Sequence, residues 1–176
     1  LIPMFNDNGE LAPTNLPLIN NGILKNTLIS SRTAQEYNIK SNHAEEWEGL
    51  RAAVMATGDL DDNNIVKEID SGVLLNNLHY LNWSDNVGGR ITGMTRYACF
   101  WVENGEIIAP IENMRFDDTI YNIFGKHLES VGNKSQFVPD IGTYSGRSIG
   151  GSNCPGILLN SFAESSHGLV SLKIES

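Results

Sequence analysis

The stretch YACFWVENGEIIAPI, residues 97–111, decides the fold, because two runs of strand-forming residues flank a single turn. The turn is Asn104-Gly105, and both residues tolerate the positive φ angles of a two-residue hairpin loop. Residues 97–103 and 106–111 are therefore predicted to pair as antiparallel strands. Alternate residues of the first run point to opposite faces, and both faces are largely apolar. This strand is predicted to lie in the centre of a covered sheet.

The same turn signal occurs earlier, at Asn21-Gly22, and predicts a second hairpin from residues 16–20 and 23–28. Further strands are predicted wherever apolar residues cluster, which gives the segments 52–56, 73–83, 156–162 and 168–174. The order of these segments predicts an α+β fold that consists mainly of antiparallel β-sheet.

Two or three short helices complete the predicted fold. The first follows Ser31, where a polar residue precedes helix-forming ones. The second would be capped by Asp61 or Asp62 and run to about Asp70, with Ile65 and Ile69 as its inner stripe. The third would start at Asp117-Asp118, and apolar residues at helical spacing continue it to His127.

Composition limits the classes of function. The 176 residues carry 12 basic and 21 acidic side chains, a net charge of −9, and predict one β-rich domain over residues 1–176. With no basic stripe to neutralise phosphates, we expect no direct nucleic-acid binding. An acidic surface and the lack of a run of about 20 apolar residues also predict no membrane partner.

The residues that could bind metal or phosphate do not form a familiar motif. The four histidines lie far apart in sequence, so no zinc-type pair is predicted. The acidic run 59–70 has oxygen ligands at positions expected of a calcium loop, but Asn64 stands where the turn glycine is needed. Residues 142–148 lack one spacer residue of a P-loop. Cys99 and Cys154 could pair, although two cysteines give no disulfide framework.

Six blocks of the sequence, taken in order, are LINNGILK (18–25), TGMTR (92–96), FWVENGEI (100–107), RFDD (115–118), VGNK (131–134) and PGILLNSF (155–162). Together they resemble the blocks of the TldD/PmbA family, which includes zinc metallopeptidases and their non-catalytic partners and is also described as modulating DNA gyrase. The resemblance implies that this chain, which begins with Leu1, is the C-terminal part of a longer protein. It also implies a cytoplasmic homo- or heterodimer with a family member.

The same resemblance bears on the metal site. In the peptidase type, an H-E-x-x-x-H helix supplies two histidine ligands, and a cysteine that follows the VGNK-like block supplies the third. Tyr144 stands at that cysteine's place, and its pKa near 10 makes it a poor zinc ligand at neutral pH. Cys154 is the one candidate metal ligand and could substitute only if the loop is reshaped. No catalytic or cofactor-binding residue is predicted in this chain, although zinc is possible in the full-length protein.

Three functions remain open. The preferred one is a non-catalytic C-terminal domain that contributes to the peptide cleft and subunit interface of a metallopeptidase-related complex, with a sheet edge binding extended or unfolded peptide. The second is part of an active zinc-dependent peptidase in which Cys154 or a water replaces the usual thiolate. The third is an unrelated β-sandwich module that binds a ligand such as carbohydrate on Trp47, Trp83 and Trp101, although Trp101 is expected in the core.

Overall fold

The structure is a computed structural model of the chain, and it describes residues 4–142, 150–162 and 172–174. Its residues form two compact units. Unit 1 comprises Leu1–Ala53 and Pro139–Ser152, and unit 2 comprises Val54–Val138 and Asn153–Ser176. That residues 1–176 fold as a single domain stays a prediction, so each unit is described by itself.

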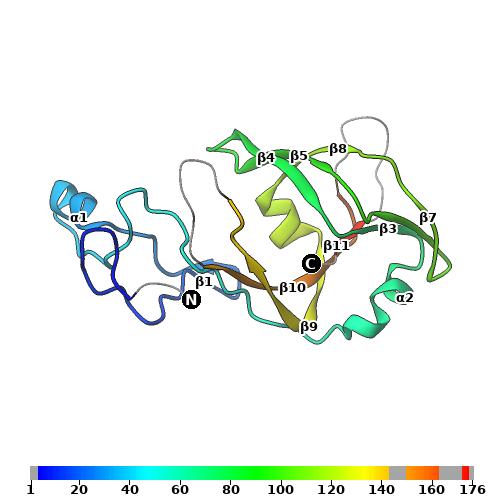
Figure 1. Cartoon of the computed structure of the whole chain (residues 1–176), viewed down its shortest axis with the longest axis horizontal. Helices are drawn as coiled ribbons and strands as arrows, with labels where there is room; N and C mark the ends of the chain where they lie inside the picture. Colours follow the sequence, from blue (N-terminus) through cyan, green and yellow to red (C-terminus); the bar gives the residue numbers. More distant parts are fainter. Residues whose placement is uncertain (1–3, 143–149, 163–171, 175–176) are drawn as a thin grey trace. The chain divides into compact units, whose positions relative to one another are not determined.

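A six-stranded sheet forms one layer of unit 2 (Figure 1). Its strand order is β7-β6-β3-β11-β10-β9. The central strand β3 pairs antiparallel with β6 and parallel with β11, and β6 forms the predicted hairpin with β7. The strands have these bounds: β3 Gly72–Leu75, β6 Phe100–Glu103, β7 Glu106–Pro110, β9 Leu128–Pro139, β10 Gly151–Leu159 and β11 Leu172–Ile174.

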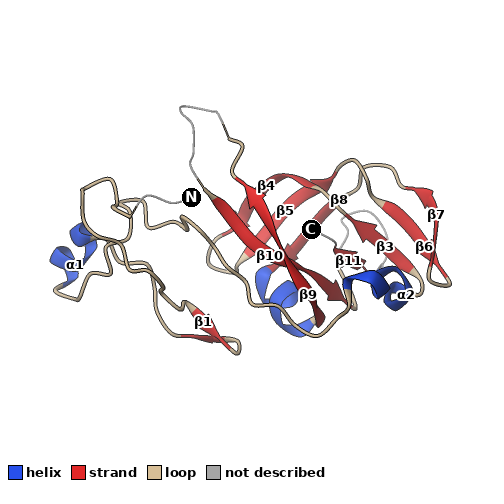
Figure 2. Ribbon diagram, turned by 60° about the horizontal axis from the view of Figure 1, so that its bottom comes forward, coloured by secondary structure: helices blue, strands red, loops and turns tan. Residues whose placement is uncertain are grey.

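A second, three-stranded antiparallel sheet has the order β4-β5-β8 (Figure 2). Its strands are β4 (Leu78–Asp85), β5 (Arg90–Thr95) and β8 (Arg115–Thr119). Helical segments of unit 2 are η1 (Asp62–Asn64), α2 (Ile65–Ile69) and η2, a π-helical turn at Asn122–Lys126. The α+β class with mainly antiparallel sheet is therefore confirmed.

The core of unit 2 lies on both faces of β3, whose four residues are all buried. Val73 and Leu75 belong to a cluster that includes Phe116 of β8 and Ile123 of η2, so the three-stranded sheet and η2 pack on this face. Leu74 belongs to a second cluster with residues of α2 and β6, so α2 covers the other face. Burial on both faces makes β3 the rigid centre of the sheet.

Unit 1 has little regular structure. A two-residue hairpin joins β1 (Ile19–Asn20) to β2 (Ile23–Leu24), and α1 spans Ser31–Tyr37. Ser30 caps α1, because its hydroxyl accepts a hydrogen bond from the amide of Thr33 at 3.1 Å. Most of the remaining described residues of unit 1 are loop and turn, so side-chain hydrogen bonds carry much of its organisation.

Both Asn-Gly hairpins are confirmed. The φ angles are 50° and 73° at Asn21-Gly22, and 51° and 73° at Asn104-Gly105. The first two helices are confirmed as well, although α1 begins at Ser31 itself and is capped by Ser30, and Asp61 caps the turn that leads into α2. Ile65 and Ile69 form the buried stripe of α2, with 4% and 3% of their surface exposed.

The predicted start of the third helix is wrong. Asp117 and Asp118 belong to β8, and the helical turn begins after Thr119, whose hydroxyl accepts from the amide of Asn122 at 3.2 Å. Pairing with β5 keeps both aspartates extended, which outweighs their local preference for a helix start.

Three strand predictions are also corrected. The segment 73–83 is divided between β3 and β4 in different sheets, because the chain leaves the first sheet at Asn76-Asn77. Residues 52–56 contribute only an isolated bridge from Val54 to Asn153. The run 97–103 is extended only from Phe100, since Ala98 has a φ of 59°.

That last strand, β6, lies second from the sheet edge, so the prediction that it is central and covered on both faces is wrong. Residues 156–159 of the predicted strand 156–162 are confirmed as part of β10, which ends at Leu159. Of the segment 168–174, residues 172–174 form β11, and residues 168–171 lie outside the described part of the chain.

Candidate functional site

The predicted metal ligand, Cys154, lies on β10 with a partly exposed side chain. It and the buried Cys99 are both free thiols, so the predicted option of a disulfide between them is not realised. Among the residues that the structure describes, no group of three His, Cys, Asp or Glu side chains could hold a metal ion. Tyr144 and His167 lie outside the described residues, and a role for Cys154 as a ligand stays a prediction.

The acidic run at residues 59–70 has a structural role. Asp61 Oδ1 accepts from the backbone and side-chain nitrogens of Asn63 at 3.1 and 2.9 Å, and Oδ2 accepts from Asn64 at 3.3 Å. These bonds satisfy donors at the start of a helix. The carboxylate of Asp61 is thus engaged in capping.

The three tryptophans are all exposed, with exposed fractions of 65% for Trp47, 56% for Trp83 and 37% for Trp101. The expectation that Trp101 belongs to the core is wrong, because Val102 and not Trp101 faces the α2 cluster. Trp83 lies on β4 and Trp101 on β6, which belong to different sheets.

The exposed edge strand β7 is the first candidate binding surface. It ends the six-stranded sheet, and all five of its residues are exposed. Ile107 and Ile108 have 50% and 55% of their surface exposed, although β-branched residues of a sheet are usually covered. An edge strand presents unpaired backbone N–H and C=O groups, so it can accept a further strand.

The outer face of the three-stranded sheet is the second candidate. Gly93, Thr95 and Phe116 are buried on the inner face, so the alternate residues point outward. Strand register then gives three outward rows across the sheet: Arg115, Met94 and His79; Asp117, Thr92 and Asn82; and Thr119, Arg90 and Asp85.

A bulge in β4 shapes this face. One extra residue lies between His79 and Asn82 relative to β5, and Tyr80 adopts a φ of 51° there. Such a conformation is uncommon for a bulky side chain, and bulges often redirect a side chain next to a functional site. Tyr80 is 71% exposed and forms one wall of a hollow on the outer face. The hollow is lined by Tyr80, Asn82, Thr92, Gly93, Met94 and Arg115.

Gly93 allows the strands to approach closely under this hollow. A methyl group added to its Cα would lie 2.7 Å from Cζ of Phe116 and 2.8 Å from Cδ2 of Leu81. The space that a side chain would need is therefore occupied by side chains from β8 and β4.

Arginines surround the face. Arg90 donates to Asp117 Oδ1 at 2.7 Å, and this hydrogen bond raises the pKa of the Arg90 guanidinium above its ordinary value. Arg96 Nη1 lies 2.8 Å from His79 Nε2, which requires the imidazole nitrogen to accept, and its guanidinium carbon is 5.4 Å from the ring centre of Tyr97. Arg96 thus lies next to the row that contains Met94, whereas Arg90 lies in the outward row farthest from it.

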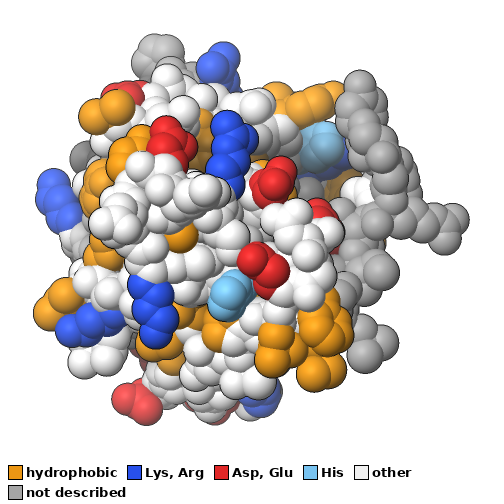
Figure 3. Space-filling model, turned by 90° about the vertical axis from the view of Figure 1, so that its left-hand side faces the viewer, with side chains coloured by type: hydrophobic (Ala, Val, Ile, Leu, Met, Phe, Trp, Pro, Cys, Tyr) orange, Lys and Arg blue, Asp and Glu red, His pale blue; other side chains and the backbone are white. Residues whose placement is uncertain are grey.

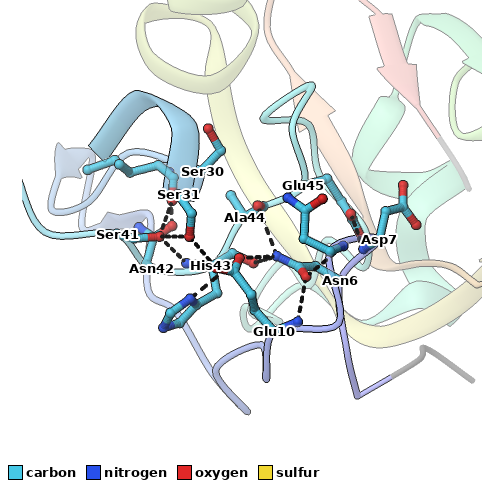
Figure 4. Close-up of polar contacts among 12 residues, drawn as sticks. Asn6, Asp7, Glu10, Ser30, Ser31, Ser41, Asn42, His43, Ala44 and Glu45 are labelled. Carbon is cyan, nitrogen blue, oxygen red and sulfur yellow. Dashed lines mark hydrogen bonds and ion pairs between the residues drawn. The ribbon is translucent and has the colours of Figure 1, made fainter. Parts of the chain in front are cut away.

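Unit 1 contains a dense polar cluster (Figure 4). The side chain of Asn6 accepts from the amides of Asn8 and Glu10 and donates to Glu10 and to two carbonyl groups, with distances of 2.8 to 3.5 Å. Glu10 also accepts from the hydroxyl of Ser31 at 2.5 Å, and its other oxygen lies 3.7 Å from His43 Nδ1. The hydrogen bond from Ser31, followed by that from Asn6, lowers the pKa of Glu10.

This grouping of Ser31, Glu10 and His43 does not have the order of a nucleophilic triad. A triad needs the imidazole against the hydroxyl, whereas here the carboxylate stands between them. The same unit holds Glu48, whose carboxylate accepts from the amide of Ser30 at 2.8 Å, and that bond lowers its pKa. Buried Glu45 pairs with Arg51 at 2.9 Å. We interpret the cluster as structural.

The surface carries mixed charge. On the face drawn in Figure 3, acidic and basic side chains are interspersed, and hydrophobic side chains reach the surface at several places. In the described part of the chain, no helix is long and apolar enough to cross a membrane.

The model of the family described as the PmbA/TldA metallopeptidase C-terminal domain matches residues 3–166. The chain belongs to this family. A search of curated proteins found no match.

Two solved structures have the same fold as this PmbA/TldA domain. TldE from Thermococcus kodakarensis is 19% identical, with a TM-score of 0.71 over 96% of this chain and 36% of that protein. A protein from Thermotoga maritima described as a candidate modulator of a DNA gyrase is 20% identical, with a TM-score of 0.68 over 93% of this chain and 35% of that protein. The chain thus spans about a third of the length of these proteins.

Membership in the PmbA/TldA family replaces the alternative of an unrelated β-sandwich module. The sequence placed Ile107 in a predicted hairpin strand and Arg115 in a family block, but it did not reveal the surfaces that they form. The edge position of β7 and the bulge at Tyr80 depend on pairings between distant segments. The paired isoleucines after Asn104-Gly105 were the one local signal for an exposed apolar strand.

Proposed function

We propose that this chain is a non-catalytic C-terminal domain that supplies a peptide-binding sheet edge and part of a subunit interface in a metallopeptidase-related protein. The observation that carries this proposal is the edge strand β7, all five residues of which are exposed. Family membership supports the metallopeptidase-related setting. The described residues offer no ligand set for zinc, so no catalytic step is derived from them.

Main-chain pairing explains how such an edge would bind extended or unfolded peptide. A peptide strand added beside β7 would gain backbone hydrogen bonds that are independent of its sequence, while Ile107 and Ile108 would contact its apolar side chains. The buried strand β3 keeps the sheet rigid, which lowers the entropy lost on binding.

A second family member is the proposed partner subunit, and the proposed location is the cytoplasm. Trp101, an exposed apolar side chain of this domain, would be covered in part by that subunit. The net charge of −9 supports peptide and protein partners over direct contact with nucleic acid.

The binding experiment compares two lysine substitutions in the full chain. Ile107→Lys introduces a charge on the edge strand and is expected to weaken binding of a labelled, extended apolar peptide about tenfold, because edge lysines oppose strand addition. Val87→Lys, at a 94% exposed position in the turn between β4 and β5, is the matched control and should leave affinity unchanged. Equal affinities of both variants would overturn the proposed edge.

Metal analysis separates the proposal from an active zinc peptidase that uses Cys154. If this domain is non-catalytic, Cys154→Ala should leave the zinc content and peptide hydrolysis of the full-length protein unchanged. Zinc at one equivalent per chain that is lost in this variant would establish the peptidase alternative instead.

A further inference from the structure

We propose that the hollow on the outer face of the β4-β5-β8 sheet binds an acidic side chain of a peptide or protein. Arg115 would be the anion-binding group, with Asn82 and the apolar surfaces of Tyr80 and Met94 around it. This inference goes beyond the proposed function, because it concerns a different sheet and selects for charge, whereas pairing along β7 does not.

The positive charge at this end of the face comes from two arginines. Arg115 and Met94 are direct partners in the β5-β8 register, and Arg96 follows Met94 by two residues. Arg115 already interacts within the chain, but a guanidinium has five N–H donors and can bind a carboxylate in addition. Arginine and carboxylate groups form paired, charge-assisted hydrogen bonds, which makes a carboxylate the matching ligand.

The acidic residues of the outward rows lie in the other two rows: Asp117 is in the middle row, as the register partner of Thr92, and Asp85 is in the row farthest from Arg115. Asp117 is held by Arg90 at 2.7 Å, and Asp85 is the register partner of Arg90. Both aspartates thus lie next to Arg90, which is at the end of the face away from Arg115. A chain of net charge −9 that keeps two arginines beside Met94 favours a ligand of negative charge there.

The apolar lining argues for a peptide rather than a small free carboxylate. The hollow lies on an exposed sheet face, where an isolated ion pair contributes little because water competes for both charges. Tyr80 is 71% exposed and Met94 is 37% exposed, so both offer surface for the aliphatic part of a side chain and its neighbours. The bulge that gives Tyr80 its φ of 51° places this ring at the wall of the hollow.

Two hydrogen bonds hold the lining in place, and a third lies beside it. The hydroxyl of Thr92 donates to the carbonyl of Phe116 at 3.0 Å, and the amide of Asn82 donates to the carbonyl of Tyr80 at 3.4 Å. Next to the hollow, Arg96 is fixed against His79 at 2.8 Å. A site whose walls are ordered before binding loses less entropy when the ligand arrives.

The test uses two capped peptides that differ only at their centre, where one has two glutamates and the other two glutamines. Acetyl and amide caps remove the terminal charges, so the side chains carry the only difference. The full chain should bind the glutamate peptide about tenfold more tightly, a preference that falls as salt is added. Equal affinity for the two peptides would overturn the proposal without any protein variant.

Protein variants then test whether the preference for the glutamate peptide depends on the hollow. Arg115→Gln should reduce the ratio of the two affinities to about one, and Lys134→Gln, which removes the same charge from an exposed position on β9, should preserve it. Met94→Glu places a carboxylate in the hollow at an exposed position and should also reduce the ratio of the two affinities to about one. Val87→Glu is its control. Circular dichroism verifies that each variant is folded.

Two results would contradict this location. One is a glutamate preference that persists in folded Met94→Glu, and the other is a preference that Lys134→Gln removes as fully as Arg115→Gln does. The Ile107→Lys variant of the β7 edge should leave the ratio unchanged, so failure of the edge proposal and failure of this inference are distinguishable. A peptide whose only carboxylate is its C-terminus should bind no better than the glutamine peptide, and tighter binding would contradict a side-chain site.

Discussion

Each of the two units is stabilised internally by a different kind of interaction. Among the described residues of unit 1, Ala44 is the one buried hydrophobic side chain, whereas Asn6, Ser30 and Glu45 are buried polar ones. Unit 2 buries two apolar clusters, one on each face of β3. Unit 1 should therefore respond to the loss of single hydrogen bonds, and unit 2 to changes in side-chain volume.

The difference also shows where binding surfaces arise. Unit 2 also has apolar side chains on its exposed edge and on the outer face of its smaller sheet, as at Ile107 and Met94. In unit 1 the charged and polar groups are engaged with one another, as Glu10 is with Asn6 and Ser31.

The largest effect is expected from emptying the core of unit 2. Phe116 is 1% exposed and its ring centre lies 4.7 Å from that of Phe162, so Phe116→Ala should lower the free energy of unfolding by about 3–5 kcal/mol. Phe124→Ala removes the same side chain from a 56% exposed position and should lower the free energy of unfolding much less. Urea unfolding followed by tryptophan fluorescence measures both, and equal losses would refute a core centred on Phe116.

A smaller effect is expected from overfilling the same core. Gly93→Ala adds a methyl group within 2.8 Å of both Phe116 and Leu81 and should destabilise unit 2 by about 1–3 kcal/mol. At Gly125 an added methyl group meets nothing within 4 Å, so Gly125→Ala is the control. Should Gly93→Ala prove neutral in thermal unfolding, the close approach of β5 to β8 would be wrong.

Replacing Asn6 by alanine should lower the free energy of unfolding of unit 1 by about 1–3 kcal/mol, because donors and acceptors of the Glu10 turn lose their partner. Hydrogen exchange is the measurement, because it reports each unit separately. Faster exchange is expected at the amide of Glu10 and not in β3. Asn15→Ala, at an exposed position, is the control, and identical exchange in the two variants would show that the Asn6 network contributes nothing.

The smallest effect is a dependence of unit 1 on pH. Hydrogen bonds from Ser31 to Glu10 and from the amide of Ser30 to Glu48 lower the pKa of each carboxyl below 4.5. Because the folded pKa is the lower one, the stabilisation is present above pH 4.5 and is lost as pH falls through the folded value. Both carboxyls should titrate below 4.5 in an NMR experiment, and titration at or above that value would contradict these bonds.

Sequence reasoning succeeded where structure is local. The Asn104-Gly105 turn and the stripe of Ile65 and Ile69 depend only on residues that are close together in sequence, and both are confirmed. It failed for the segment 73–83, because the division between β3 and β4 is decided by which distant strands each half pairs with.

The candidate surfaces were harder to predict for the same reason. Tyr80, Met94 and Arg115 come from three strands and meet only through register and one bulge. No alternation pattern reveals an extra residue in a strand, since the bulge shifts the pairing without a required residue type. The family blocks predicted the fold and the metallopeptidase-related family. They did not predict which side chains lie next to one another.

Hydrogen exchange of the full chain with and without a saturating extended peptide tests the central claim most directly. The account predicts slower exchange at the amides of β7, Glu106–Ala109, while the β1-β2 hairpin of unit 1 exchanges as before. Unchanged exchange along β7 in the presence of bound peptide would contradict the account, because a strand added to that edge must protect its backbone.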